Sequence, residues 1–229
     1  MRVGIAGYGV VGKTRHRSIE SNTSYQVTAI SESSEKARKS IPEGMTVYND
    51  YKTLIASAEL DVIFISLPNQ FAAEAACLSL QNGLHVFCEK PPARTHAELL
   101  EVEKQSLKFP ELKLMYGFNH RFHLSVEEAK LLIDSNSLGR LINMKGVYGK
   151  SQMISFNQTD WRTDREASGG GILLDQGIHM LDLMRYLSGE NFTDVFSIID
   201  NAFWNFDVED NAYVLMKSPK GLVAQLHSS

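Results

Sequence analysis

Short apolar runs alternate with amphipathic stretches along the first half of this chain. The apolar runs are almost continuous, which is typical of parallel strands that are covered on both faces. They predict strands at Arg2–Ala6, Tyr25–Ile30, Asp61–Ser66, Leu84–Phe87 and Lys113–Tyr116. The stretches between them predict helices at Val10–Ser21, Glu35–Ser40, Tyr51–Ala56, Gln70–Gln81 and His96–Lys108. Because strands alternate with helices, we expect an α/β domain with a parallel sheet and right-handed crossovers.

The pattern changes after about Asn119. Helices are predicted at Leu124–Ser135 and Ile172–Leu187, with a strand at Leu141–Tyr148 and a polar, aromatic loop at Ser151–Ser168 between them. Further strands are predicted at Val195–Phe203, Asn211–Met216 and Leu222–His227. We therefore expect an α/β domain at 1–120 and an α+β domain with a mainly antiparallel open sheet at 121–229. Since the chain stops just after what reads as an inner strand, we expect the second domain to be truncated at its C-terminus.

A glycine-rich turn follows the first predicted strand. Its sequence is Gly7-Tyr8-Gly9-Val10-Val11-Gly12. The dinucleotide fingerprint uses its first glycine for a tight turn, its second for close approach of the pyrophosphate and its third for close packing of helix and strand. The following helix N-terminus offers N–H groups to the anion. The first domain is therefore predicted to be a Rossmann dinucleotide-binding domain.

The choice of cofactor depends on the residues about 20 positions further on, where a carboxylate reads the ribose of NAD. Ser31 takes the expected acidic position and Glu32 is its neighbour. Glu32 could accept hydrogen bonds from both ribose hydroxyls, which favours NAD. Ser31 could instead leave room for a 2′-phosphate near Lys36 or Arg38, so NADP remains an alternative.

Two further segments follow strands at the sheet edge where open α/β sheets bind ligands. Leu67-Pro68-Asn69 is expected to touch the cofactor or simply to start a helix, with Asn69 as its N-cap. In Glu89-Lys90-Pro91, the ammonium of Lys90 could bind a substrate hydroxyl and stabilise the alkoxide that forms as hydride leaves. An isolated Glu-Lys-Pro is otherwise a solvated turn.

Asp175 and His179 are four residues apart on the second long helix, so they are expected to share a face. His179 is the candidate general base. Asp175 would bind substrate or hold the imidazole, and Asp182 could also orient it. The preceding Gly169-Gly170-Gly171 would allow a ligand close to the backbone. The structural alternative is a core histidine and a helix cap, and no metal site is predicted.

Composition restricts the partners. The chain has 229 residues, a formal net charge of −4 and a pI near 6.0, with 43% hydrophobic and 22% charged residues. Its basic residues are scattered, so no nucleic-acid surface is expected. No apolar run is long enough to cross a bilayer, and the N-terminus enters a strand at once, so a cytoplasmic protein is expected. Cys77 and Cys88 are expected to be reduced and buried.

Together these segments resemble the glucose–fructose oxidoreductase/inositol dehydrogenase family, often called Gfo/Idh/MocA. The resemblance covers essentially the whole chain and rests on Gly7-Tyr8-Gly9-Val10-Val11-Gly12, Leu67-Pro68-Asn69, Glu89-Lys90-Pro91, Gly117-Phe118-Asn119-His120-Arg121-Phe122, Gly169-Gly170-Gly171 and Asp175-Gln176-Gly177-Ile178-His179-Met180-Leu181-Asp182. It implies hydride transfer between NAD or NADP and a hydroxyl or carbonyl carbon of a sugar, a cyclitol or a nucleotide sugar.

The resemblance also implies roles for individual residues. Lys90 would be the catalytic lysine, and Asp175 and His179 the substrate-binding and proton-transfer pair. Trp161-Arg162 is similar to members that act on nucleotide-linked sugars, so Arg162 is a further substrate-binding candidate, with a surface charge as the alternative. The residues expected to bind the cofactor are Gly7, Tyr8, Gly9, Val10, Val11, Gly12, Ser31, Glu32, Leu67, Pro68, Asn69, Glu89, Lys90 and Asn119.

The chain departs from the family pattern at two positions. Ser31 stands where the family usually has Asp, and Ala72 where it often has His. The family uses the open sheet of its second domain to form dimers and tetramers, so a homodimer or homotetramer is expected. The alternatives on the same scaffold are an NAD-dependent glycoside hydrolase and a non-catalytic nucleotide or sugar sensor.

Overall fold

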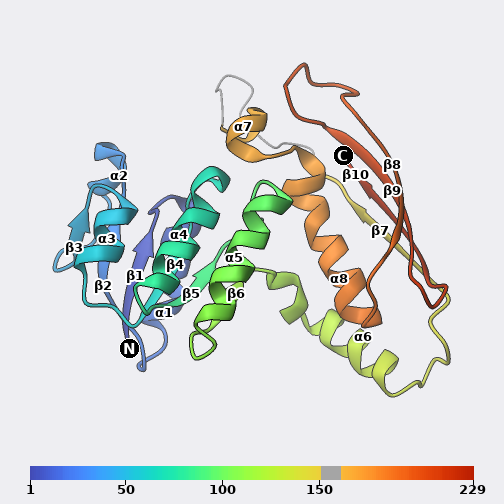
Figure 1. Cartoon of the computed structure of the whole chain (residues 1–229), viewed down its shortest axis with the longest axis horizontal. Coiled ribbons are helices and arrows are strands. Elements are labelled where there is room, and N and C mark those ends of the chain that lie inside the picture. The colour runs from blue at the N-terminus through green and yellow to red at the C-terminus, as the bar shows by residue number, and fades with distance from the viewer. Residues whose placement is uncertain (151–160) are drawn as a thin grey trace. The chain divides into compact units, whose positions relative to one another are not determined.

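The computed structural model describes residues 1–150 and 161–229 and divides into two compact units, Met1–Gly117 and Phe118–Ser229. The division falls slightly before the boundary at residue 120 that the sequence predicts. Figure 1 shows the elements of each unit.

The first unit contains a parallel sheet in the order β3-β2-β1-β4-β5-β6. This order is that of a doubly wound dinucleotide-binding domain, as predicted. Its strands are β1 (Arg2–Ala6), β2 (Gln26–Ser31), β3 (Thr46–Tyr48), β4 (Val62–Ile65), β5 (His85–Cys88) and β6 (Leu114–Tyr116). The sequence does not predict β3, because this strand has three residues, none of them buried.

Helices cover both faces of this sheet. They are α1 (Val10–Glu20), α2 (Glu35–Arg38), α3 (Tyr51–Ser57), α4 (Asn69–Gln81) and α5 (His96–Lys108). In β4, Ile63 and Ile65 pack with residues of α3, α4 and α5, whereas Phe64 packs against a second cluster that includes Ile19 of α1. Strands buried on both faces explain the continuous apolar runs in the sequence.

The described part of the second unit contains a sheet in the order β7-β10-β9-β8. Its strands are β7 (Asn143–Tyr148), β8 (Asp194–Asp200), β9 (Asn211–Lys217) and β10 (Val223–Ser228). The pairings of β9 with β8 and with β10 are antiparallel, whereas β7 lies parallel to β10. The predicted α+β architecture with a mainly antiparallel sheet is confirmed.

Helix α8 (Ile178–Ser188) covers one face of this sheet through Met184, which packs with Val214, Met216 and Leu226. The chain reaches β7 through a 3₁₀ turn, η1 (Asn119–Phe122), and through α6 (Leu124–Asp134). Figure 1 shows α8 running beside the sheet.

Two predictions for this unit are wrong. The predicted helix Ile172–Leu187 begins instead as a π-helical turn, η3 (Leu173–Gly177), and continues as α8. The predicted loop Ser151–Ser168 contains a 3₁₀ turn, η2 (Trp161–Thr163), and a short helix, α7 (Arg165–Ser168); its residues 151–160 lie outside the described part.

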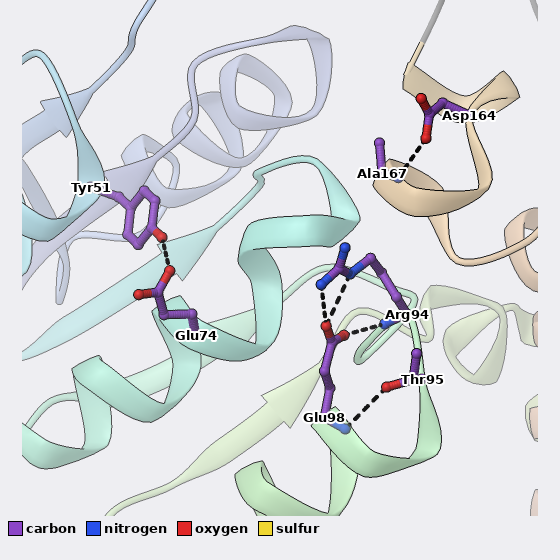
Figure 2. A network of polar contacts seen from close by, with 7 residues as sticks. All are labelled: Tyr51, Glu74, Arg94, Thr95, Glu98, Asp164 and Ala167. Carbon is purple, nitrogen blue, oxygen red and sulfur yellow. Dashed lines mark hydrogen bonds and ion pairs between the residues drawn. The ribbon is translucent and has the colours of Figure 1, made fainter.

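The side chain of Asp164 caps α7 by accepting from the N–H of Ala167 at 2.9 Å (Figure 2).

The face of the second sheet that α8 does not cover carries exposed apolar side chains. Phe196 pairs with Leu215 across β8 and β9, and Ile198 pairs with Tyr213. Phe196 is 66% exposed and Leu215 is 50% exposed. Among the described residues, no helix has the length and apolar character needed to cross a membrane.

Candidate active site

The glycine turn of the first unit has the geometry that the fingerprint requires. Gly7 has φ +88°, and a Cβ atom there would lie 2.5 Å from the carbonyl oxygen of Ser66. A Cβ atom on Gly12 would lie 2.1 Å from the carbonyl oxygen of Gly7. Around Gly9, by contrast, no atom lies within 4 Å of a Cβ position. Gly7 and Gly12 are therefore needed for packing, and Gly9 leaves space for an approaching ligand.

The N-terminus of α1 suits an anion. Gly9 is its N-cap, no side chain caps it, and its first turn carries no acidic residue. Val10, the first residue of α1, is 84% exposed, so a ligand can reach the N-terminus of this helix. The first N–H groups of a helix carry partial positive charge and need an acceptor. These residues therefore fit the pyrophosphate of a dinucleotide.

The end of β2 places a carboxylate at this turn. Glu32 Oε2 accepts from the backbone N–H of Tyr8 at 2.9 Å, and Oε1 accepts from that of Ser34 at 2.8 Å. The hydroxyl of Tyr8 lies 2.6 Å from Nδ1 of His16, and burial followed by the charge of Glu20 raises the pKa of this tyrosine. Glu32 and Tyr8 are thus held together before any ligand binds.

Two residues near Glu32, Ser31 and Arg38, also bear on the choice of cofactor. The hydroxyl of Ser31 is buried, with no hydrogen-bond partner among the described residues. Arg38 donates through Nη1 to the carbonyl oxygens of Glu32 and Ser33, both at 2.9 Å. The carboxylate of Glu32, rather than the Ser31 hydroxyl, therefore reaches the glycine turn.

The segment after β4 starts α4. The helix begins at Asn69, and Pro68 is its N-cap, so Asn69 is not the cap that the sequence suggests. Proline fits the start of a helix because it has no N–H to leave without a partner. Leu67 packs against the apolar cluster beneath α4, which leaves Pro68 and Asn69 nearer to the sheet edge.

Lys90 follows β5, and its neighbour Glu89 is held by α1. Arg15 Nε donates to Glu89 Oε1 at 2.6 Å, and the Arg15 guanidinium lies 4.9 Å from the ring centre of Phe87. A Cβ atom on Gly117 would lie 2.7 Å from Glu89 Oε2. The Lys90–Pro91 peptide bond is cis. Sequence reasoning missed Arg15, since no spacing rule links residues 74 positions apart.

Asp175 and His179 belong to the second unit. Asp175 lies in the π-helical turn and accepts from the Gln176 amide at 2.7 Å, whereas His179 lies in the first turn of α8 and is 4% exposed. The spacing predicts that both residues lie on one regular α-helix. The structure instead places Asp175 in the π-helical turn and His179 in α8. A Cβ atom on Gly177 would lie 2.6 Å from Ser228 Oγ, so close packing on β10 explains this glycine.

Aromatic rings surround His179. The ring centres of His120 and His179 lie 4.1 Å apart with an interplanar angle of 17°, and that of Tyr148 lies 6.0 Å from His179 at 23°. Phe118 meets the imidazole edge to face at 6.2 Å. Sequence reasoning named none of these three as a neighbour of His179, although His120 and Phe118 lie within the Gly117–Phe122 motif.

Asp182 forms an ion pair with Arg121. Both of its carboxylate oxygens accept from Arg121, with Nε at 2.7 Å and Nη2 also within hydrogen-bonding distance. The hydrogen bond to Asp182 raises the pKa of Arg121. This ion pair joins η1 to α8, and it therefore has a structural role.

The three glycines before the π-helical turn pack against the protein itself. Gly169 ends α7 in a left-handed conformation. A Cβ atom on Gly171 would lie 1.9 Å from the carbonyl oxygen of Glu209, which accepts from the N–H of Ile172 at 3.0 Å. The buried carboxylate of Glu209 accepts from the N–H of Leu173 at 3.2 Å. Contact with Glu209, rather than with a ligand, explains the small residue at Gly171.

The remaining candidates lie on the second unit as well. Asn119 is exposed and starts η1. The guanidinium of Arg162 lies 4.4 Å from the ring centre of Trp161, and Arg165 Nε donates to the carbonyl oxygen of Asp207 at 3.0 Å. No cluster of His, Cys, Asp and Glu in the described ranges could hold a metal ion.

Two family models match the chain. Residues 1–116 match an oxidoreductase family described by its NAD-binding Rossmann fold, and residues 126–229 match the GFO/IDH/MocA C-terminal domain. The chain belongs to the Gfo/Idh/MocA family. Its first unit is therefore an NAD-binding Rossmann domain.

Named relatives of this Gfo/Idh/MocA protein are dehydrogenases. The D-glucoside 3-dehydrogenase of Escherichia coli strain K12 is 30% identical over 200 residues, which cover 82% of this chain and 54% of the relative. The myo-inositol 2-dehydrogenase of Thermotoga maritima is 25% identical over 239 residues, which cover 100% of this chain and 68% of that enzyme. The chain thus spans about half of the length of the glucoside dehydrogenase.

A solved structure shares the fold. The crystal structure of myo-inositol 2-dehydrogenase from Lactobacillus plantarum has a TM-score of 0.89 and 26% identity, covering 99% of this chain and 69% of that one. The Gfo/Idh/MocA fold is therefore present over essentially the full length of this chain.

Proposed function

We propose that this chain is the cofactor-binding and catalytic part of an NAD-dependent dehydrogenase that oxidises a hydroxyl group of a sugar or a cyclitol. The observation that carries the proposal is the position of Lys90. It follows β5, and β4 lies between β5 and β1 in one parallel sheet. The carboxyl ends of these strands share one edge, so Lys90 lies on the same edge of the sheet as the glycine turn.

The proposed mechanism divides the reaction between three residues. His179 takes the proton of the substrate hydroxyl, and Lys90 donates a hydrogen bond to the same oxygen as negative charge develops there. Asp175 binds a second substrate hydroxyl and holds the substrate against His179. NAD held by the glycine turn and Glu32 would supply the hydride acceptor, and the substrate would leave as a carbonyl compound.

The test is the Lys90→Ala variant. We expect turnover to fall by roughly 10²–10³-fold, because a preorganised donor at the reacting oxygen is lost. NADH affinity, measured by fluorescence titration, should stay close to that of the wild type. Lys104→Ala, which removes one positive charge from an α5 side chain that is 67% exposed, is the matched control. Wild-type turnover in Lys90→Ala would exclude this mechanism.

We also propose that the cofactor is NAD rather than NADP. Glu32 is fixed by two backbone N–H groups and retains lone pairs for ribose hydroxyls, and its charge would repel a 2′-phosphate. Arg38, a basic residue beside this segment, donates to the main-chain oxygens of Glu32 and Ser33. Titration should give tighter binding of NADH than of NADPH, and Glu32→Ser should reduce that difference. Equal affinities in the wild type would contradict the proposal.

The substrate class is proposed from the relatives. Their names include dehydrogenases of glucosides, levoglucosan and myo-inositol. We expect a free or glycosidic sugar or a cyclitol, with Arg162 as a candidate contact for an anionic group if the sugar is linked to a nucleotide. A screen of hexoses, glycosides, inositols and UDP-sugars should show NADH formed in proportion to product. Product without net NADH would indicate a hydrolase, and cofactor binding without turnover would indicate a sensor.

We propose further that a second copy of the chain covers the exposed sheet face of the second unit. Phe196, Ile198, Tyr213 and Leu215 lie together on that face, each at least 45% exposed. Contiguous apolar surface of this kind marks interaction sites in soluble proteins. A homodimer or homotetramer through this sheet is the expected assembly.

A further inference from the structure

We propose that His120 is a positioning residue for His179, and that the stack of these two imidazoles fixes the plane of the proposed general base. The inference rests on the proposed function, because that proposal assigns His179 as the general base. Its structural part, the stack itself, is independent of any substrate.

The stack is built from three nearly parallel rings. His120 lies 4.1 Å from His179 at 17° and 5.5 Å from Tyr148 at 19°. Phe118 meets His179 at 90°, so it closes off rotation of the imidazole out of the stack. His179 is 4% exposed, and a ring bounded in these two directions has few orientations left.

Stacking orients a base in a way that a hydrogen bond cannot. A ring that packs against the face of an imidazole contacts its π system, whereas the nitrogen lone pair and N–H lie in the ring plane. His120 can therefore fix the orientation of His179 without using either ring nitrogen. Proton transfer requires such an orientation, since a reacting group misplaced by 1 Å can lose about 10²-fold in rate.

The backbone that carries His120 is tied to the helix that carries His179. The next residue, Arg121, makes the two-pronged ion pair with Asp182 of α8. The Asp182 side chain is 9% exposed, which favours a strong, well-ordered pair. Because Asp182 lies less than one helical turn after His179, this pair sets the separation of the two imidazoles.

The stack also limits how many protons the two histidines can carry. Two imidazolium rings at 4.1 Å would repel each other, whereas one imidazolium over a neutral ring is attracted. In the described part of the chain, the titratable side chains recorded against these rings are His123, whose ring meets that of His120 at 84°, and Tyr148. Asp175 lies four residues before His179, and the Arg121–Asp182 ion pair joins the residue after His120 to a residue three positions after His179. His120 therefore competes with His179 for one proton, and this competition keeps His179 available as a base at lower pH.

Three variants test the proposal in the full chain. His120→Ala removes the stacked ring, and we expect turnover to fall by about 10²-fold with NADH affinity unchanged. His120→Phe keeps a stacked ring but cannot bind a proton. It should retain turnover at high pH while the acid limb of its kcat/KM profile moves to higher pH. His123→Phe, which changes a ring that meets His120 edge to face and keeps it aromatic, should behave as the wild type.

Nuclear magnetic resonance of the histidine ring protons tests the stack without a substrate. In the wild type, the signals of His120 and His179 should titrate as one coupled pair, and His120→Phe should leave a single simple titration for His179. Independent titration of both rings in the wild type would overturn the proposal, as would unchanged turnover in His120→Ala. If the wild type turns over no substrate, the proposed function fails. The titration would still show whether His120 and His179 are coupled.

Discussion

At the scale of single residues, the glycines of the first turn divide into two kinds. A side chain at Gly12 would collide with the backbone of Gly7, whereas a side chain at Gly9 would meet nothing in the protein. Gly9 has φ −71°, a value that any residue adopts. The spacing of these glycines predicts their presence, but only their surroundings separate a folding role from a binding role.

This division gives a prediction for two alanine variants. Gly12→Ala should lower the thermal unfolding temperature, because its Cβ would lie 2.1 Å from a carbonyl oxygen that cannot move freely. Gly9→Ala should keep the unfolding temperature and weaken NADH binding by a clear margin, since the methyl group would occupy space that the pyrophosphate needs. Calorimetry and fluorescence titration measure the two effects. A lower unfolding temperature in Gly9→Ala, together with normal stability in Gly12→Ala, would contradict these roles of the two glycines.

Other residue contacts could not be predicted from spacing. Arg15 of α1 meets Glu89, which follows β5, and Arg121 of η1 meets Asp182 of α8. Periodicity describes neighbours within an element, and these pairs join different elements. The sequence thus names Lys90, Asp175 and His179 as candidates but leaves out Arg15, which binds Glu89 beside Lys90, His120, which stacks on His179, and Glu209, which binds the amides of Ile172 and Leu173.

At the scale of elements, the start of α5 is fixed by side-chain hydrogen bonds of Thr95 and Glu98. Thr95 Oγ1 accepts from the N–H of Glu98 at 3.2 Å, as in a capping box. The Glu98 carboxylate accepts from the N–H of Arg94 at 2.9 Å and from its guanidinium (Figure 2). Burial raises the pKa of Glu98, but these hydrogen bonds outweigh it and hold the pKa below its usual value.

Two variants test this cap. Thr95→Ala should cost about 1 kcal/mol of unfolding free energy, the ordinary loss for an N-cap threonine. Glu98→Gln should destabilise the protein at neutral pH. A carboxyl whose pKa is lowered in the folded state contributes stability above its unfolded pKa, and that contribution is lost as pH falls through the folded pKa. Urea unfolding at pH 7 and pH 3 should therefore show a smaller difference from the wild type at the lower pH.

The errors at this scale have physical causes. Apolar periodicity locates α5 and β1 with their observed bounds, because both have a strong pattern and clear ends. It misses the π-helical turn at Leu173–Gly177, because one extra residue in a turn leaves the apolar pattern almost unchanged. Such turns are frequent at functional sites, and this one carries Asp175.

At the scale of the whole molecule, the two units bury their apolar residues unevenly. The first unit has buried clusters on both faces of its sheet. In the second unit, every residue of β8 is exposed, including Phe196 and Ile198. An apolar strand at the edge of a sheet favours association with another chain.

The proposed assembly predicts the effect of charge on this face. Phe196→Lys combined with Leu215→Lys should convert an oligomer to a monomer in light scattering after size-exclusion chromatography, because two desolvated ammonium groups would face each other across the interface. Leu131→Lys on α6, also an exposed leucine, is the control and should keep the mass of the wild type. A wild-type monomer at micromolar concentration would contradict the proposal.

The contact of Glu209 with the start of the π-helical turn should slow the exchange of two amide protons with solvent deuterium. Amide protons in the first turn of a helix normally exchange quickly, because they have no partner within the helix. Here the amides of Ile172 and Leu173 are bonded to the main chain and the side chain of Glu209. Their protons should exchange only when the Glu209 segment separates from this turn. The exchange rate of these two protons would thus report how often the segment before Asp175 and His179 comes loose.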